Sequence, residues 1–112
     1  MMDEARFEVL FAPDAEVDLA SIGAFLAANG SPKIARNWLR KLRDAALKLE
    51  YFPARGSLPA ELEGAPTRGY RQVVVRPYRI IYRIEGTTVV VAVVADARRD
   101  MRALLESRLF NR

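Results

Sequence analysis

The spacing of hydrophobic residues changes along the first part of the chain. Over residues 6–11, apolar side chains occupy every second position: Phe7, Val9 and Phe11. This alternation is typical of a β-strand with one buried face. From Pro13 the apolar residues recur every three or four positions, which predicts an amphipathic helix that ends at Asn29-Gly30. Its apolar stripe comprises Ala15, Leu19, Ile22, Phe25 and Leu26.

A second helix is predicted from Ser31-Pro32 to about Tyr51, because serine followed by proline is a common helix start. Its apolar stripe comprises Ile34, Ala35, Trp38, Leu39, Leu42, Ala45, Ala46 and Leu49. The position of Trp38 in this stripe predicts that it belongs to the core. Basic residues recur on another face: Lys33, Arg36, Arg40 and Arg43. This basic face is either simply solvated or a contact surface for a partner.

The second half of the chain begins with a proline- and glycine-rich loop over residues 53–69, in which Leu58 and Leu62 are candidates to anchor it. Three β-rich runs follow at residues 70–75, 78–84 and 89–95. Arg76-Pro77 marks the first turn between them, and Glu85-Gly86-Thr87 marks a hairpin. A last helix is predicted over residues 97–110, with one apolar side formed by Met101, Leu104, Leu105 and Leu109.

These elements give the order β-α-α-β-β-β-α, and we expect one α+β domain over residues 1–112. Two consecutive amphipathic helices bury their stripes most readily by packing on one face of a sheet. The sequence therefore predicts two N-terminal helices on one face of a small, mainly antiparallel four-stranded sheet.

The alternation along the third predicted strand assigns its side chains to opposite faces of this sheet. Beneath the helices we expect Tyr78, Ile80, Tyr82 and Ile84, and on the open face Arg79, Ile81 and Arg83. The fourth strand is apolar on both sides, with Val89, Val91 and Val93 opposed to Val90, Ala92 and Val94. Strands of this kind are covered on both faces, so either the last helix or a partner must cover the second face.

Composition limits the chemistry that is available to this chain. It has no cysteine and no histidine, which excludes disulfides, thiolate metal sites and the usual general base near neutral pH. We expect no metal and no cofactor. No apolar run reaches the roughly 20 residues of a membrane span, and the first residues lack the pattern of a secretion signal, so we expect a cytoplasmic protein.

The charges are unevenly distributed along the chain. Residues 1–31 carry a net charge of −5 and residues 32–112 carry +9, which together give +4. Such a field suits RNA, DNA or an acidic protein as partner, although an ordinary solvated surface would account for it too.

The order of elements and several short motifs resemble the RelE/ParE superfamily of toxins from type II toxin–antitoxin modules. The resemblance covers nearly the whole chain. It is strongest in the run Pro77-Tyr-Arg-Ile-Ile-Tyr82, the valine-rich strand that follows and the exit Arg98-Arg99-Asp100. The turn Phe52-Pro-Ala-Arg-Gly56 and Tyr70-Arg71 add to it. The superfamily has two branches: RelE-like members cut mRNA in the ribosomal A site, and ParE-like members inhibit DNA gyrase without cutting RNA.

The resemblance places Arg71, Arg79 and Arg99 at basic positions that serve RelE-like cleavage. Arginine can hold a phosphate but is a poor proton donor or acceptor, because its pKa stays above about 12. Leu104 and Leu105 stand where RelE-like nucleases place a tyrosine, and no lysine follows Lys48. The resemblance therefore favours a ParE-like gyrase inhibitor that does no catalysis. A RelE-like ribosome-dependent endoribonuclease, in which Tyr70, Tyr78 or Tyr82 supplies stacking or a proton, is the alternative, and a non-toxic module that only sequesters an antitoxin is a third reading.

The resemblance also implies a partner, a small acidic antitoxin of the ParD type with a ribbon-helix-helix N-terminus, in a toxin–antitoxin hetero-oligomer. The residues that we expect at partner contacts are Arg71, Arg79, Ile81, Arg83, Arg98 and Arg99. The antitoxin contact itself is expected at Arg79, Ile81 and Arg83, where charge reversal of the arginines would weaken the complex. The opposing interpretation is that these arginines pair with carboxylates of this chain and have only a structural role.

Overall fold

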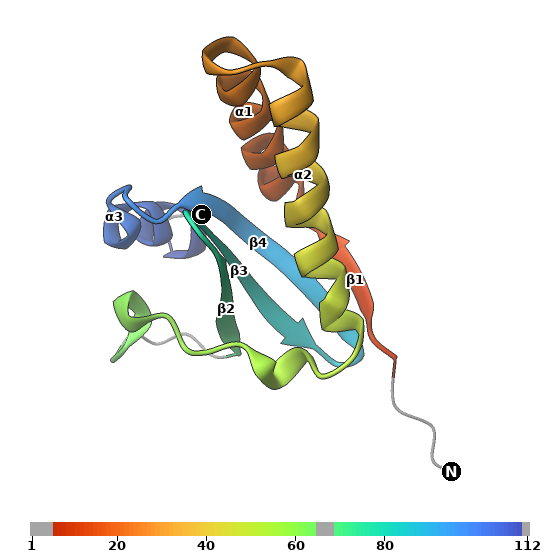
Figure 1. Ribbon diagram of the computed structural model, residues 1–112. Helices are drawn as coiled ribbons and strands as arrows, with labels where there is room; N and C mark the ends of the chain where they lie inside the picture. Colours follow the sequence, from red (N-terminus) through yellow and green to blue (C-terminus); the bar gives the residue numbers. More distant parts are fainter. Residues whose placement is uncertain (1–5, 65–68, 111–112) are drawn as a thin grey trace.

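The computed structural model describes residues 6–64 and 69–110. Its elements follow the predicted order β-α-α-β-β-β-α (Figure 1). The strands are β1 (Glu8–Phe11), β2 (Tyr70–Val75), β3 (Tyr78–Glu85) and β4 (Thr88–Asp96). The helices are α1 (Pro13–Asn29), α2 (Pro32–Leu47) and α3 (Met101–Leu105), the last of which continues as a π-helix over Glu106–Phe110.

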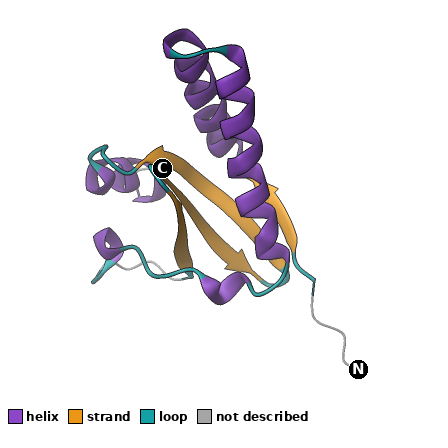
Figure 2. Ribbon diagram, in the orientation of Figure 1, coloured by secondary structure: helices purple, strands orange, loops and turns teal. Residues whose placement is uncertain are grey.

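The sheet has the strand order β1-β4-β3-β2. β1 runs parallel to β4, whereas β2–β3 and β3–β4 are antiparallel. Parallel strands need a long connection, and here α1 and α2 form part of it. They return the chain across the sheet before β2 begins, and β4, the last strand, then pairs in parallel with β1. The sheet is therefore mixed, with two antiparallel pairings out of three, and the two long helices stand together as a hairpin over one side of it (Figure 2).

The predicted helix starts are confirmed, with small shifts at several ends. Pro13 opens α1, and the Ser31 hydroxyl accepts a hydrogen bond from the Ile34 amide at 3.1 Å at the start of α2. α2 ends four residues before the predicted end, where a 3₁₀ turn over Lys48–Glu50 follows. The last helix begins only at Met101, because the Asp100 carboxylate caps it by accepting from the Ala103 amide at 3.1 Å.

One core lies between the helical hairpin and the sheet, as predicted. Its buried members are Ala15, Leu19, Leu42, Ala46, Leu49, Tyr78, Ile80, Tyr82, Val89, Val91 and Val94. Trp38 packs against this core, with its ring edge-on to Tyr78 at a centroid distance of 5.3 Å, which confirms that it is a packing residue. Phe25 departs from the prediction, since its side chain is 64% exposed near the far end of α1.

A second core fills the other face of the sheet, so the expectation of an open face there is wrong. α3 and the loop before β2 cover it, and its buried members are Leu62, Ile81, Ala92, Val93, Ala95, Met101 and Leu105. The sequence left open whether the last helix or a partner covers this face, and the helix does so. In the loop, Leu62 is buried and acts as the anchor, whereas Leu58 is exposed; residues 65–68 of this loop lie outside the described residues.

A β-bulge in β4 changes the predicted faces of that strand. Ile81 pairs with Val93, but the next residue, Tyr82, pairs with Val91. Ala92 is therefore an extra residue in β4 that has no pairing partner in β3. As a result Val93 joins the second core and Val94 joins the first, the reverse of strict alternation. Within residues 6–64 and 69–110, no helix is long and apolar enough to cross a membrane.

Candidate partner-binding groove

Arg79, the central residue of the predicted contact, forms an ion pair within the protein and is not exposed at the surface. Its two terminal nitrogens donate to the carboxylate of Glu61 at 2.9 and 2.7 Å, and its Nε donates to Gln72 Oε1 at 2.7 Å. The residue is only 9% exposed. The guanidinium lowers the pKa of Glu61 to about 2, against an opposing effect of partial burial.

The other residues of the predicted antitoxin contact are also engaged within the chain. Ile81 is fully buried in the second core. Arg83 pairs with Glu85, two residues further along β3, and is partly exposed. The opposing interpretation of these arginines, internal pairing, therefore describes Arg79 and Arg83.

Arg71 has a local structural role at the opposite end of the loop. Its guanidinium donates to the Gly56 carbonyl at 2.9 Å, and the Gly56 amide donates to the Tyr82 hydroxyl at 3.1 Å. That hydroxyl in turn donates to the Pro53 carbonyl at 2.6 Å. A side chain at Gly56 has no room, since a Cβ would lie 2.4 Å from the Tyr82 hydroxyl and 2.5 Å from the Gln72 carbonyl oxygen. This cluster fixes the turn after α2 against the sheet.

Two of the three tyrosines considered for stacking or proton transfer are unsuited to either role, whereas Tyr70 is partly exposed and lines a hollow beside Arg83. Tyr82 is fully buried and Tyr78 is 6% exposed. Burial raises the pKa of both hydroxyls, so proton donation becomes harder. Arg71, Arg79 and Arg99 occupy three different settings, namely a loop contact, a buried ion pair and an exposed turn.

The exposed members of the predicted set, Arg98 and Arg99, lie at the exit of β4. Arg98 donates to Asp96 through Nε at 2.8 Å and remains 81% exposed on its side chain. The Arg99 side chain makes no ion pair with a carboxylate of residues 6–64 or 69–110, Asp100 included. The Arg98 guanidinium lowers the pKa of Asp96 to about 2, so this exit carries one paired charge and one available positive charge.

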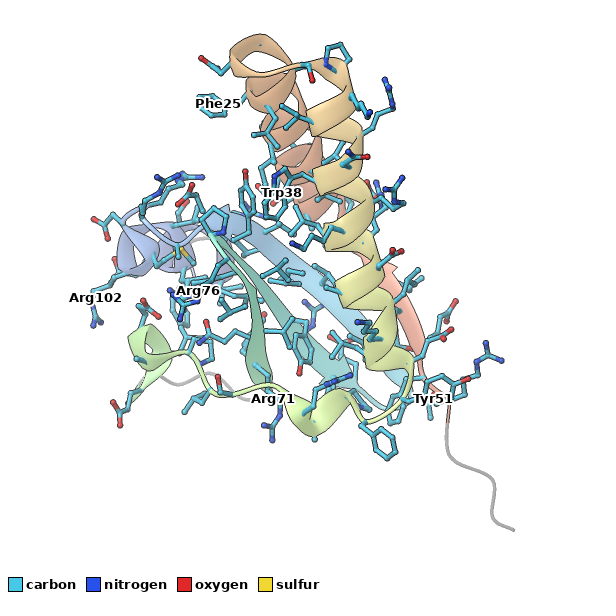
Figure 3. The ribbon with its side chains drawn as sticks, viewed as in Figure 1. Phe25, Trp38, Tyr51, Arg71, Arg76 and Arg102 are labelled. Carbon is cyan, nitrogen blue, oxygen red and sulfur yellow. The ribbon has the colours of Figure 1, made fainter. Side chains whose placement is uncertain are left out.

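Both arginines border a groove of about 570 Å³ between the helical hairpin and the end of β4. We refer to it as the hairpin groove. Its apolar lining comes from Ile22, Phe25, Leu26, Trp38, Tyr78 and Val94. Figure 3 shows Phe25 projecting from the end of the hairpin and Trp38 further down, towards the sheet. An exposed aromatic side chain beside a partly apolar hollow is a common feature of protein-binding surfaces.

The groove exists because β1 is too short to cover β4. β1 ends at Phe11, opposite Val91, and the chain then turns into α1. Beyond this point, the outer edge of β4 is met by side chains instead of a strand: the Val94 amide donates to Asp18 at 2.9 Å, and Arg108 donates to the Ala92 carbonyl at 2.7 Å. Two further bonds of 3.0 Å join Arg108 to Asp18 and tie the end of the chain to α1.

Sequence reasoning missed the groove because four separate segments form it: α1, α2, the start of β3 and the end of β4. It did identify Arg98 and Arg99, but it placed Phe25 in the apolar stripe of α1. One signal was available: the α1 stripe is wider at its C-terminal end, where Phe25 and Leu26 are adjacent apolar residues. Two neighbouring large residues on a helix cannot both face the same narrow core.

Comparison with known proteins agrees with this architecture. The family model of the ParE toxin of the type II toxin–antitoxin system parDE matches residues 9–101. Toxin ParE3 of Caulobacter vibrioides is 27% identical over 88 residues, which span 79% of this chain and 84% of that protein.

Two solved structures share the fold. A chain of the chromosomal ParDE toxin–antitoxin system of P. aeruginosa superposes with a TM-score of 0.69 at 14% identity, covering 82% of this chain and 97% of that one. A chain of the RelBE2 toxin–antitoxin complex of Mycobacterium tuberculosis superposes with a TM-score of 0.58 at 26% identity, covering 84% and 97%. With the family match extending over most of its length, this chain belongs to the ParE toxin family of type II toxin–antitoxin systems.

Proposed function

We propose that this toxin arrests growth by binding and inhibiting DNA gyrase, without cutting RNA, and that a ParD-like antitoxin neutralises it. One observation carries the choice between the two branches. Arg79, which the RelE-like pattern would use on phosphate, is 9% exposed. All three nitrogens of its guanidinium donate hydrogen bonds, two to Glu61 and one to Gln72. A guanidinium that is already paired in this way has little capacity left for a transition-state charge.

The absence of histidine and the burial of Tyr78 and Tyr82 support the same branch. General acid–base catalysis needs a group that exchanges protons near neutral pH. The chain has no histidine, and the pKa values of the two buried tyrosine hydroxyls are raised. The carboxylates of Glu61 and Asp96, with pKa values of about 2, are held ionised by arginines and are poor acids and weak bases.

A RelE-like ribosome-dependent endoribonuclease remains the second candidate, because a chain of a RelBE2 complex is 26% identical and has the same fold. In this candidate Arg71, Arg79 and Arg99 would have to hold the phosphate together. That requires Arg79 to leave Glu61 and the second core to open. Codon-positioned cuts in mRNA on programmed ribosomes would establish this activity, and intact mRNA would remove it.

The hairpin groove is the surface that we assign to the antitoxin. Its apolar lining suits the hydrophobic side of an amphipathic segment, and Arg99, with Arg98 beside it, suits acidic residues along the rim of such a segment. This assignment replaces the expected contact at Arg79 and Ile81, which are buried. Arg83 is partly exposed, and its charge is balanced by Glu85.

Expression with and without the neighbouring antitoxin gene tests the proposal in cells. We expect growth arrest and induction of the DNA-damage response when the toxin is expressed alone, and normal growth when both genes are expressed. Arrest with cleaved mRNA and no DNA-damage response would instead support the endoribonuclease. Normal growth on expression of the toxin alone would show a non-toxic module that only binds an antitoxin.

A further inference from the structure

A second positively charged surface lies along the solvent side of α2, away from the hairpin groove. We call it the α2 basic surface and define it by six exposed side chains: Lys33, Arg36, Arg40, Lys41, Lys48 and Arg55. From Lys33 to Lys48 it extends for about 22 Å at the helical rise of 1.5 Å per residue. α2 lies on the outside of the molecule, where only its inner side contacts α1 and the sheet (Figure 1).

The charges on this surface are not neutralised by carboxylates of the described residues, although Lys41 lies 4.6 Å from the centre of the Trp38 ring and Arg40 donates to Asn37 Oδ1 at 3.3 Å. None of the six side chains pairs with a carboxylate of residues 6–64 or 69–110. By contrast Arg43, on the side of α2 that faces α1, donates to Glu16 at 2.7 and 3.3 Å. A solvated helix face commonly carries mixed charges that pair every three or four residues. Here Asp44 is the one acidic residue of α2, so the surface keeps a strong positive excess.

The shape of the surface adds a second observation. Two adjoining shallow grooves follow it, of about 740 and 510 Å³, and they share Asp44 and Lys48. Arg40, Lys41 and Lys48 line the first, and Lys48 and Arg55 line the second together with Tyr51. Figure 3 shows Tyr51 at the end of the helical segment that bears the basic residues. Four of the six positive charges therefore border these grooves, together with the acidic residues Asp44 and Glu50, whereas Lys33 and Arg36 lie on the helix beyond them.

The turn that closes the surface holds an exposed aromatic ring in a strained backbone. Phe52 has φ of 55° and ψ of 56° and is 67% exposed. Left-handed backbone is rare for a large side chain, and the α regions are disfavoured before a proline such as Pro53. The cluster around the Tyr82 hydroxyl fixes this turn. An exposed ring kept at an energetic cost is a common property of contact sites.

We infer that the α2 basic surface binds the phosphate backbone of duplex DNA. Over about 22 Å a DNA strand presents about six phosphates, and five of the six basic side chains lie within that span, so charges and phosphates have a similar spacing. An acidic peptide is the less suitable occupant, because it needs apolar anchors, and the apolar lining of the hairpin groove is more extensive than that of either groove on the α2 basic surface. The inference rests on the proposed function, in which the target enzyme works on DNA: the toxin would contact gyrase and its DNA together.

Fluorescence anisotropy with a labelled DNA duplex of about 20 base pairs tests the inference on the isolated toxin. The variant Arg36→Gln/Arg40→Gln should bind about tenfold more weakly than the wild type at 50 mM salt. The slope of log affinity against log salt should fall by about 2, one for each lost phosphate contact. The matched control Arg98→Gln/Arg99→Gln removes the same charge at the hairpin groove, and it should stay within about twofold of the wild type.

Three results would overturn the inference. Equal losses in the two double variants would show that only net charge matters. Displacement of the duplex by polyglutamate at equal charge concentration would indicate an acidic protein partner. Equal or tighter binding of an RNA duplex of the same sequence would remove the assignment to DNA. Because the assay contains no gyrase, its outcome is separate from the proposed function: DNA binding without gyrase inhibition would contradict the latter alone, and inhibition without DNA binding would contradict the former alone.

Discussion

The carboxylate of Glu61 meets the guanidinium of Arg79 through two hydrogen bonds of 2.7 and 2.9 Å and so fastens the loop before β2 to the centre of the sheet. The residues are 18 positions apart in the chain, and the Arg79 side chain is 10% exposed. A planar guanidinium and a carboxylate form this two-pronged pair with defined geometry. The arginine that the family pattern would assign to phosphate is thereby part of the structural framework.

This pair should make stability depend on pH in the acid range. The folded-state pKa of Glu61, about 2, lies below its ordinary value of 4.5, so the stabilisation is complete above pH 4.5 and is lost as the pH falls towards 2. The free energy of unfolding of the wild type, relative to that of Glu61→Gln, should decrease by about 2 kcal/mol between pH 6 and pH 3. Urea denaturation at the two pH values measures this. A difference between the proteins that does not change with pH would show that the pair contributes nothing to the folded state.

The contact between Asp18 and Arg108 should be equally important at the other end of the sheet. Asp18→Ala removes the carboxylate that accepts two hydrogen bonds from Arg108 and one from the Val94 amide. The mostly buried positive charge of Arg108 then lacks the negative charge of Asp18 beside it. We expect a loss of about 2–4 kcal/mol in the free energy of unfolding. Asp14→Ala is the control, because that carboxylate is 62% exposed and lies 3.6 Å from Arg108, and it should cost under about 1 kcal/mol. Similar losses in the two variants would refute the specific role of Asp18.

The assignment of the hairpin groove predicts a loss of antitoxin affinity without a loss of stability. Phe25 is 64% exposed, so Phe25→Ser should leave the unfolding midpoint nearly unchanged and weaken antitoxin binding at least tenfold, which is about 1.4 kcal/mol. Val17→Ser is a matched control on the same helix, since Val17 is 62% exposed and does not line the groove. Isothermal titration with the purified antitoxin gives both affinities. If Val17→Ser weakens binding as much as Phe25→Ser does, the antitoxin binds elsewhere on α1.

The order of elements and most of the core could be predicted from hydrophobic spacing. The period of two over residues 78–84 and the stripe on α2 are strong local signals, and the structure buries Tyr82, Ile80 and Leu42 as they indicate. Local signals end where long-range pairing begins. The bulge at Ala92 follows from the way that β4 meets β3, and no pattern in the run Val89–Ala95 distinguishes Val93 from Val94.

The site was less predictable than the fold, for a related reason. Alternation correctly separates Arg79 from Tyr78 and Ile80. It contains no information about Glu61, which reaches Arg79 only because the loop over residues 60–62 folds across the second face. Charge counts show that arginines are abundant, but which of them remain available depends on such contacts. Arg98 and Arg99 could be identified because they follow a strand directly, where the chain leaves the sheet.

The most direct test of the central proposal is a supercoiling assay with purified toxin and gyrase from the same host. We predict that micromolar toxin abolishes the supercoiling of relaxed plasmid, and that an equimolar amount of the neighbouring antitoxin restores it. The same toxin should leave mRNA on programmed ribosomes intact. Full supercoiling at micromolar toxin, measured with a preparation that still binds its antitoxin, would contradict gyrase inhibition as the function of this protein.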